Sequence, residues 1–132
     1  MVDNNSYCRN SKDVSAFLKF TRDTADDKLI VLYLDNHDDV ILTTFHPWNI
    51  DDFDLCSQSI IGMALNTEAY GVIIVHNQPS GGIAPSPDDK KLANNIFVQL
   101  DSFGRVLQDY IINSGDHRYY SMADNSILVG SK

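Results

Sequence analysis

The chain has 132 residues, with 10 lysines and arginines against 18 aspartates and glutamates and a formal net charge of −8. A chain of this length forms one domain that buries roughly two-thirds of the surface of its unfolded form, so it needs no disulfide or metal to fold. The acidic balance argues against direct nucleic-acid binding through a basic stripe, and the longest apolar run, residues 72–75, is too short to cross a membrane.

The cysteine content bears on the compartment. Two lone cysteines, Cys8 and Cys56, favour a reducing environment over a secreted, disulfide-bonded one. The N-terminus also lacks the basic stretch followed by an apolar stretch that is typical of a secretory leader. We therefore expect a cytoplasmic protein with a short polar lead over residues 1–10 and a single domain over residues 11–132.

The first half of the chain predicts one helix followed by two antiparallel strands. Ser11 is a typical helix cap, and one face of the helix carries Val14, Phe17, Leu18 and Thr21. Residues 29–34 are almost wholly apolar, which is typical of a strand covered on both faces. A polar turn at residues 36–39 then predicts a second strand from residue 40 to residue 45 or 46, running back beside the first.

A second helix and a central strand follow. The helix is expected over residues 55–65, after an acidic loop, and the continuous apolar run 70–75 predicts the strand. The segment 76–85 contains Pro79, Gly81 and Gly82, which are typical turn residues. We therefore expect the central strand to end at residue 75.

A third helix and a final hairpin complete the domain. Ser86 as cap and Pro87 at the first helical position predict the start of the helix, and Gly104 predicts its end. Its expected buried stripe consists of Leu92, Ile96, Leu100 and Phe103. Residues 106–113 and 118–122 predict the hairpin. The order αββαβαββ indicates an α/β (α+β) fold with a mixed β-sheet flanked by helices.

Polar residues gather after the central strand, where open α/β sheets tend to place their sites. His76, Ser86 and Asp89 lie within fourteen residues of one another. Ser86 and Asp89 also have the spacing of a helix capping box, in which the serine hydroxyl and the acidic side chain bind the free backbone N–H groups. A structural role is therefore sufficient to explain these two residues, and it does not exclude a site.

The segment from His76 to Asp89 resembles the RadC-like branch of the JAB/MPN (JAMM) metal-hydrolase family. The family signature is His-x-His-Pro, seven residues between the second histidine and a serine, then two residues and an aspartate. Pro79-Ser80-Gly81 matches the Pro-Ser-Gly of this branch, and Ser86 and Asp89 stand at the family spacing from His76. The resemblance extends over residues 13–123 and implies a fold of the cytidine-deaminase-like, JAB-MPN type.

The resemblance implies a zinc site in which two histidines and an aspartate hold the metal and a water takes the fourth position. His76 and Asp89 stand at two of these ligand positions. A glutamate on an early strand is the general base of the family, and the serine, here Ser86, stabilises the developing oxyanion. Three protein ligands with one open position are what a catalytic zinc requires, because the ion must activate its bound water.

This sequence departs from the family pattern at several positions. Gln78 replaces the second histidine, and its amide oxygen is a weaker zinc ligand than imidazole. Matching the Leu34-Asp35 turn onto the family puts the glutamate position at Thr43 or Thr44, with Thr44 preferred. The only glutamate, Glu68, belongs to a different part of the pattern. Tyr110 stands where the family has a histidine. Loss of a general base alone costs on the order of 10²–10⁴ in rate.

Other polar residues have competing interpretations. His46 lies two residues beyond Thr44 on the same strand face, so it is a possible substitute ligand or an inert strand-end histidine. The acidic residues at 51, 52 and 54 lack the glycine and glutamate of a calcium loop, which favours a solvated loop. Cys56 is interpreted as a structural thiol, although its place at a helix start allows a lowered pKa.

These observations predict a catalytically impaired RadC-like JAB/MPN domain that acts as a binding or scaffolding module for a protein or peptide. We expect no enzymatic activity, and either no cofactor or weakly bound zinc. The alternative is a divergent zinc-dependent metallopeptidase or isopeptidase-type hydrolase of amide-like bonds with a substitute base. If the site is a relic, replacing Gln78 by His together with Thr44 by Glu should restore zinc binding.

Overall fold

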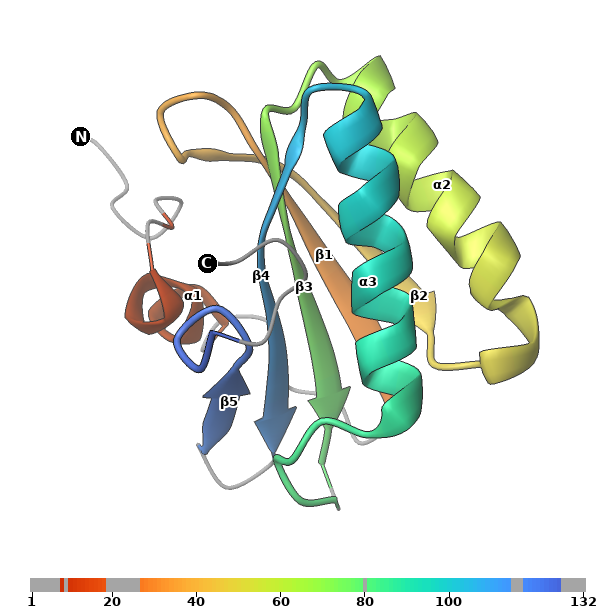
Figure 1. The fold of residues 1–132 in the computed structure, drawn as a ribbon. Helices are drawn as coiled ribbons and strands as arrows, with labels where there is room; N and C mark the ends of the chain where they lie inside the picture. The colour runs from red at the N-terminus through yellow and green to blue at the C-terminus, as the bar shows by residue number, and fades with distance from the viewer. Residues whose placement is uncertain (1–7, 9, 19–26, 80, 115–117, 127–132) are drawn as a thin grey trace.

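The computed structural model describes residue 8 and residues 10–18, 27–79, 81–114 and 118–126. In this part of the chain a mixed sheet of five strands separates a layer formed by helices α2 and α3 from the short helix α1 on the opposite face (Figure 1). The predicted class and element order are confirmed. The elements are α1 (Ser11–Leu18), β1 (Lys28–Leu34), β2 (Val40–Pro47), the 3-10 turn η2 (Ile50–Asp52), α2 (Phe53–Asn66), β3 (Gly71–Gln78), α3 (Pro87–Ser102), β4 (Val106–Ser114) and β5 (Tyr119–Ser121).

The sheet has the order β2-β1-β3-β4-β5, and β3 and β4 are its parallel pair. The apolar segment of β1 is fully buried, as expected for a strand with a helical layer on each side. One core lies under α2 and α3, and a smaller one lies under α1. Residues in register across the sheet share a face, so His46 on β2 and His76 on β3 flank Leu29 of β1 on the α2/α3 side.

The central strand is longer than its apolar run. We expected it to end at residue 75, but β3 continues to Gln78. Pairing accounts for the difference, because Asn77 is in register with Lys28 of β1 and Gln78 with Ser114 of β4. The strand ends before Pro79, which has no backbone N–H for a further ladder bond. His76 therefore lies within a central strand, with an exposed fraction of 1%.

The end of α3 corrects a second expectation. Phe103 was expected in the buried stripe, but its side chain is 55% exposed. The helix ends at Ser102 and Phe103 is its C-cap, so the helical spacing that would direct its side chain inward stops there. Gly104 follows at φ +72°, a left-handed conformation that glycine adopts without steric cost. Thr21 and residues 115–117, between the two strands of the predicted hairpin, lie outside the described residues.

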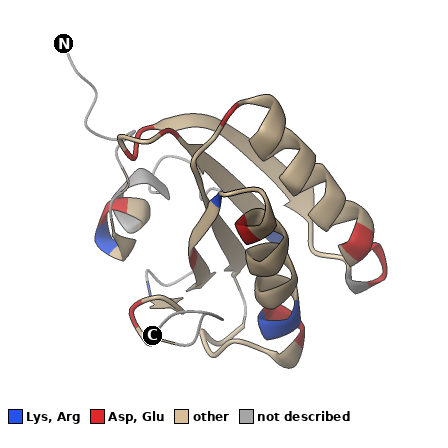
Figure 2. Cartoon of the chain, turned by 45° about the horizontal axis from the view of Figure 1, so that its top comes forward, with Lys and Arg blue, Asp and Glu red and all other residues tan. Residues whose placement is uncertain are grey.

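Charged residues lie mainly in loops and at helix ends (Figure 2). Lysines and arginines are scattered among the described elements and form no continuous stripe in this view. None of the helices in the described ranges is long and apolar enough to span a bilayer.

Candidate functional site

Three elements bring the polar residues of the site together. His76 lies near the carboxyl end of β3, Asp89 lies in the first turn of α3, and Tyr110 lies on the neighbouring strand β4. The side chains of His76 and Asp89 are 1% exposed and that of Tyr110 is 0% exposed. The start of α3 is thus packed against the sheet, with its acidic side chain directed at two buried strand residues.

Asp89 accepts four hydrogen bonds. Its Oδ1 accepts from Nδ1 of His76 at 2.8 Å and from the hydroxyl of Tyr110 at 2.6 Å. Its Oδ2 accepts from the backbone N–H of Ser86 at 2.9 Å and from the Ser86 hydroxyl at 2.8 Å. In return, the backbone N–H of Asp89 donates to the Ser86 hydroxyl at 3.1 Å. The predicted capping box is therefore confirmed, and the same carboxylate also holds the histidine and the tyrosine.

These contacts determine where the protons lie. Burial by itself raises the pKa of Asp89, but the hydrogen bonds from His76, Tyr110 and Ser86 outweigh it, and the net pKa lies below the usual value. The carboxylate is therefore ionised near neutral pH and only accepts, so Nδ1 of His76 carries a proton. Burial and the nearby charge of Asp89 raise the pKa of Tyr110 well above its usual value, so Tyr110 is a neutral phenol that donates.

The other side of the His76 ring faces Trp48. The two rings stack with centroids 3.8 Å apart and planes at 16°, and Phe53 packs edge-on against Trp48. Among the described residues, Nε2 of His76 has no hydrogen-bond partner, and Oδ2 of Asp27 lies 3.9 Å away, beyond hydrogen-bond range. Neither Trp48 nor Asp27 was predicted to lie at the site. Trp48 is the only tryptophan and comes two residues after His46, but no spacing rule connects either residue to His76.

Thr44 and His46 lie on β2 and bind each other. The Thr44 hydroxyl is 3.0 Å from the Tyr33 hydroxyl and 3.0 Å from Nε2 of His46. Burial lowers the pKa of His46, so its ring is neutral at pH 7. Leu29 separates His46 from His76 in the sheet register. The structure thus places His46 against Thr44. The role of His46 as a substitute ligand stays a prediction.

Gln78 closes the loop that follows β3. Its Nε2 donates to the carbonyl oxygen of Gly82 at 2.7 Å. The side chain lies so close to Gly81 that a Cβ atom there would be 2.2 Å from Nε2. Any larger residue at 81 would have to displace the amide, so glycine and glutamine fit each other here. Gln78 therefore acts as a loop-closing residue, and Ser80 lies outside the described residues.

The described side chains do not fit a zinc ion in this arrangement. Nδ1 of His76 donates to Oδ1 of Asp89 at 2.8 Å, so these two atoms bind each other, and the Gln78 side chain at the remaining ligand position donates to the Gly82 carbonyl. No group of three or more histidine, cysteine, aspartate or glutamate side chains in the described ranges is placed to hold a metal. Glu68 precedes β3 and so lies at the opposite end of that strand from His76.

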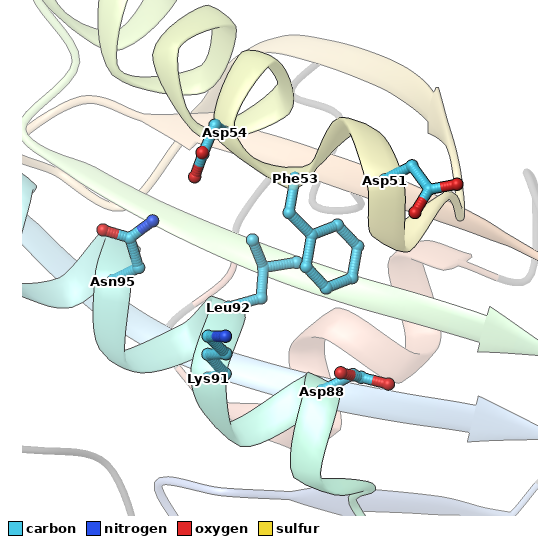
Figure 3. Close-up of a pocket in the computed structure, with 7 residues that line it drawn as sticks. All are labelled: Asp51, Phe53, Asp54, Asp88, Lys91, Leu92 and Asn95. Carbon is cyan, nitrogen blue, oxygen red and sulfur yellow. The ribbon is translucent and has the colours of Figure 1, made fainter.

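An acidic hollow lies beside the site, between the start of α2 and the first turns of α3 (Figure 3). Its walls carry three aspartates and one lysine around a small apolar floor. The lining residues are Asp51, Phe53, Asp54, Asp88, Lys91, Leu92 and Asn95. The aspartates at 51, 52 and 54 are exposed, in agreement with the solvated loop expected there. The hollow favours positively charged groups over acidic ones.

Neither cysteine is an activated nucleophile. Both are free thiols. Burial raises the pKa of Cys56 above its usual value, so its position near the start of α2 does not produce a reactive thiolate. Burial, with a smaller contribution from Asp13 and Asp38, raises the pKa of Cys8 to about 12. This environment supports a structural role for Cys56.

Comparison with known proteins gives a consistent set of relatives. The chain is 28% identical to UPF0758 protein FN0909 of Fusobacterium nucleatum, over 97% of this chain and 56% of the relative. It is 31% identical to UPF0758 protein PM1152 of Pasteurella multocida, over 91% of this chain and 54% of the relative. It is 32% identical to UPF0758 protein YkfG of Escherichia coli K12, over 74% of this chain and 62% of the relative.

The chain thus spans 54–62% of the length of these relatives. The family model described as the RadC-like JAB domain matches residues 8–127. This range contains every helix and strand described above, together with the His76, Ser86, Asp89 and Tyr110 cluster. Because the match covers nearly all of the sequence, the chain belongs to the RadC-like JAB domain family.

Proposed function

We propose that this chain is a RadC-like JAB domain that has lost zinc-dependent hydrolysis and acts as a binding or scaffolding module for a protein or peptide. The observation that carries the proposal is the environment of Asp89, whose two oxygens accept four hydrogen bonds from protein donors. In this state the negative charge of the carboxylate is stabilised by N–H and O–H donors of His76, Tyr110 and Ser86 in place of a metal ion.

The proton acceptor of the family is also missing. The family resemblance puts the glutamate position at Thr43 or, preferably, Thr44, and a threonine hydroxyl is not a base near neutral pH. The Thr44 hydroxyl is also held by Tyr33 and by His46. Removal of a general base costs on the order of 10²–10⁴ in rate, and loss of a ligating imidazole adds to that cost. These two changes together support a domain without hydrolytic turnover.

Zinc content and hydrolysis test the loss of chemistry. We expect the protein purified without chelators to contain far less than one zinc per chain, measured by elemental analysis, and to cleave no peptide or isopeptide substrate in the presence of added zinc. His76→Ala and Asp89→Asn are expected to leave this low zinc content unchanged. One tightly held zinc per chain that disappears in His76→Ala would overturn the proposal.

The alternative function is a divergent hydrolase of amide-like bonds. It is favoured by one observation: Nε2 of His76 has no hydrogen-bond partner in the part of the chain that the structure describes. A histidine oriented by a carboxylate at Nδ1 presents its other nitrogen as a base or a ligand. Metal-dependent turnover that both His76→Ala and Asp89→Asn abolish would establish this alternative. The same assay therefore separates the two functions.

The outer edge of β2 is the surface that best supports a peptide partner. β2 is an edge strand of the sheet in the part of the chain that the structure describes, and its sequence carries no acidic residue, lysine or arginine. Ile41 and Phe45 on this strand are 44% and 53% exposed. Asp39 precedes the strand. At its far end one hollow is lined by Asp27 and Lys28 and the other by Asp52, so aspartates outnumber lysines around the strand. We propose an extended peptide with apolar and basic residues as the occupant.

A labelled peptide of alternating lysine and valine tests this surface, with an alternating glutamate and valine peptide as the charge control. We expect binding of the basic peptide, measured by fluorescence anisotropy, and a loss of at least about tenfold in affinity in Phe45→Lys, because an anchoring aromatic is replaced by a repelling charge. Val98→Lys on α3 is the matched control, since Val98 is 54% exposed. Equal losses in both variants would show that charge alone governs binding.

The net charge of −8 argues against nucleic acid as the partner, so we expect no salt-sensitive DNA binding. Both described cysteines are free thiols, which supports a cytoplasmic location for the protein.

A further inference from the structure

We propose that Tyr110 closes the metal position of this domain, because its hydroxyl occupies a lone pair of Asp89, the carboxylate that an ion would need as a ligand. The inference rests on the proposed loss of zinc hydrolysis and names the residue that enforces it. It starts from the contact between Tyr110 and Asp89, in which the hydroxyl donates to Oδ1 at 2.6 Å. This oxygen is also the partner of His76.

Tyr110 is fixed in this position by the sheet. It lies in the middle of β4, in register with Ile74 of β3, and is fully buried among the apolar residues under α2 and α3. Its hydroxyl lies close to Asp89 only because the first turn of α3 packs above these strands. A buried phenol with a second acceptor elsewhere could turn away at little cost, but the only hydrogen bond described for this hydroxyl is the one to Asp89.

The Tyr110 hydroxyl and the His76 N–H converge on one carboxylate oxygen. Oδ1 of Asp89 accepts from the Tyr110 hydroxyl at 2.6 Å and from Nδ1 of His76 at 2.8 Å, so both of its lone pairs are in use. A zinc ion would have to displace one of these two donors to reach that oxygen.

A requirement for restoring the site follows. From the sequence we expect Gln78→His together with Thr44→Glu to restore zinc binding. The contact to Asp89 adds a third condition, because a new histidine at 78 supplies a ligand without freeing the carboxylate. Gln78→His alone is expected to bind zinc weakly, and removal of the Tyr110 hydroxyl in the same chain is expected to release the site.

The test compares three variants by calorimetric titration with zinc alone. Gln78→His is the reference, Gln78→His with Tyr110→Phe removes the hydroxyl, and Gln78→His with Tyr33→Phe is the matched control. Tyr33 is also a buried strand tyrosine, and its hydroxyl contacts Thr44. We expect the Tyr110→Phe combination to bind zinc about 10–100-fold more tightly than the reference, the range typical of groups that control a metal ligand, and the Tyr33→Phe combination to match the reference.

Each other result contradicts the inference. If the reference already binds zinc as tightly as the Tyr110→Phe combination, or if neither binds, Tyr110 does not control the site. An equal gain with Tyr33→Phe would indicate general loosening of the core. These outcomes leave the hydrolysis assay on the unmodified protein untouched, so failure of this inference and failure of the proposed function are separate results.

Two further measurements cover a variant that does not fold. Tyr110→His, which places the histidine of the family pattern at this position, replaces Tyr110→Phe in the same titration. On the unmodified protein, proton NMR reports the Nδ1–H of His76, which is expected to exchange slowly and to keep its shift in excess zinc. Loss of this resonance on zinc addition would show that the ion enters despite Tyr110 and would overturn the inference.

Discussion

Asp89→Ala is expected to lower the free energy of unfolding by about 3–5 kcal/mol, the range for removal of one partner from a buried charged network. The change leaves His76, Tyr110 and the Ser86 N–H without their acceptor in a buried environment. Ser86→Ala removes only the cap hydroxyl and is expected to cost about 1 kcal/mol. Urea unfolding monitored by circular dichroism measures both values.

Asp101→Ala is the matched control for this prediction. Asp101 is an exposed aspartate on the same helix, α3, and its loss is expected to change stability by at most about 0.5 kcal/mol. Equal effects of Asp89→Ala and Asp101→Ala would mean that the four hydrogen bonds of Asp89 do not hold α3 to the sheet.

The same carboxylate predicts a dependence of stability on pH. Because the folded pKa of Asp89 lies below the unfolded value of about 3.9, its stabilising contribution is complete above that value. It is lost as the pH falls through the folded pKa, when the folded protein must take up a proton. The difference in unfolding free energy between the unmodified protein and Asp89→Ala is therefore expected to shrink below about pH 4.

Asp109→Ala is expected to lower the free energy of unfolding by about 2–3 kcal/mol, because buried donors lose their acceptor. Asp109 accepts from the Ser121 hydroxyl at 2.6 Å, from the Ala123 N–H at 3.0 Å and from its neighbour's N–H at 2.7 Å. These bonds hold the short strand β5 (Tyr119–Ser121) and the turn after it on β4. Hydrogen exchange is therefore expected to increase most over residues 119–126.

The pH dependence of Asp109 has the opposite sign. Burial raises its pKa above the usual value, although its hydrogen bonds act against this shift. The folded state therefore binds the proton more tightly, and this group's contribution to stability decreases as the pH rises from the unfolded pKa to the folded one. Asp109→Asn should remove this dependence and cost less than Asp109→Ala, because its amide oxygen still accepts. A uniform increase of exchange along the whole sheet would contradict the local role.

Local patterns in the sequence predict the local features of the fold. The apolar run of β1 predicts a strand with two covered faces, and Ser86 and Asp89 predict the capping box that begins α3. The extension of β3 to Gln78 depends on pairing with β1 and β4, which a single strand's composition does not encode. Phe103 continues the helical spacing, but the backbone leaves the helix at that residue.

The candidate site is only partly encoded in local spacing. His76, Ser86 and Asp89 lie close in the sequence, so a motif predicts their proximity. Tyr110 reaches Asp89 from 21 residues away through the parallel pairing of β3 and β4. The stacking of Trp48 on His76 likewise depends on the path of the chain after β2. Such contacts are fixed by tertiary packing, and a spacing rule within one segment does not contain them.

The stacked pair of Trp48 and His76 gives this protein a built-in optical probe. Trp48 is the only tryptophan, so the indole emission of the chain originates at one place, 3.8 Å from the imidazole at the centre of the polar cluster. Protonation, displacement or ligation of that imidazole changes the quenching of the indole beside it. Fluorescence of the unlabelled protein therefore reports directly on what happens at His76.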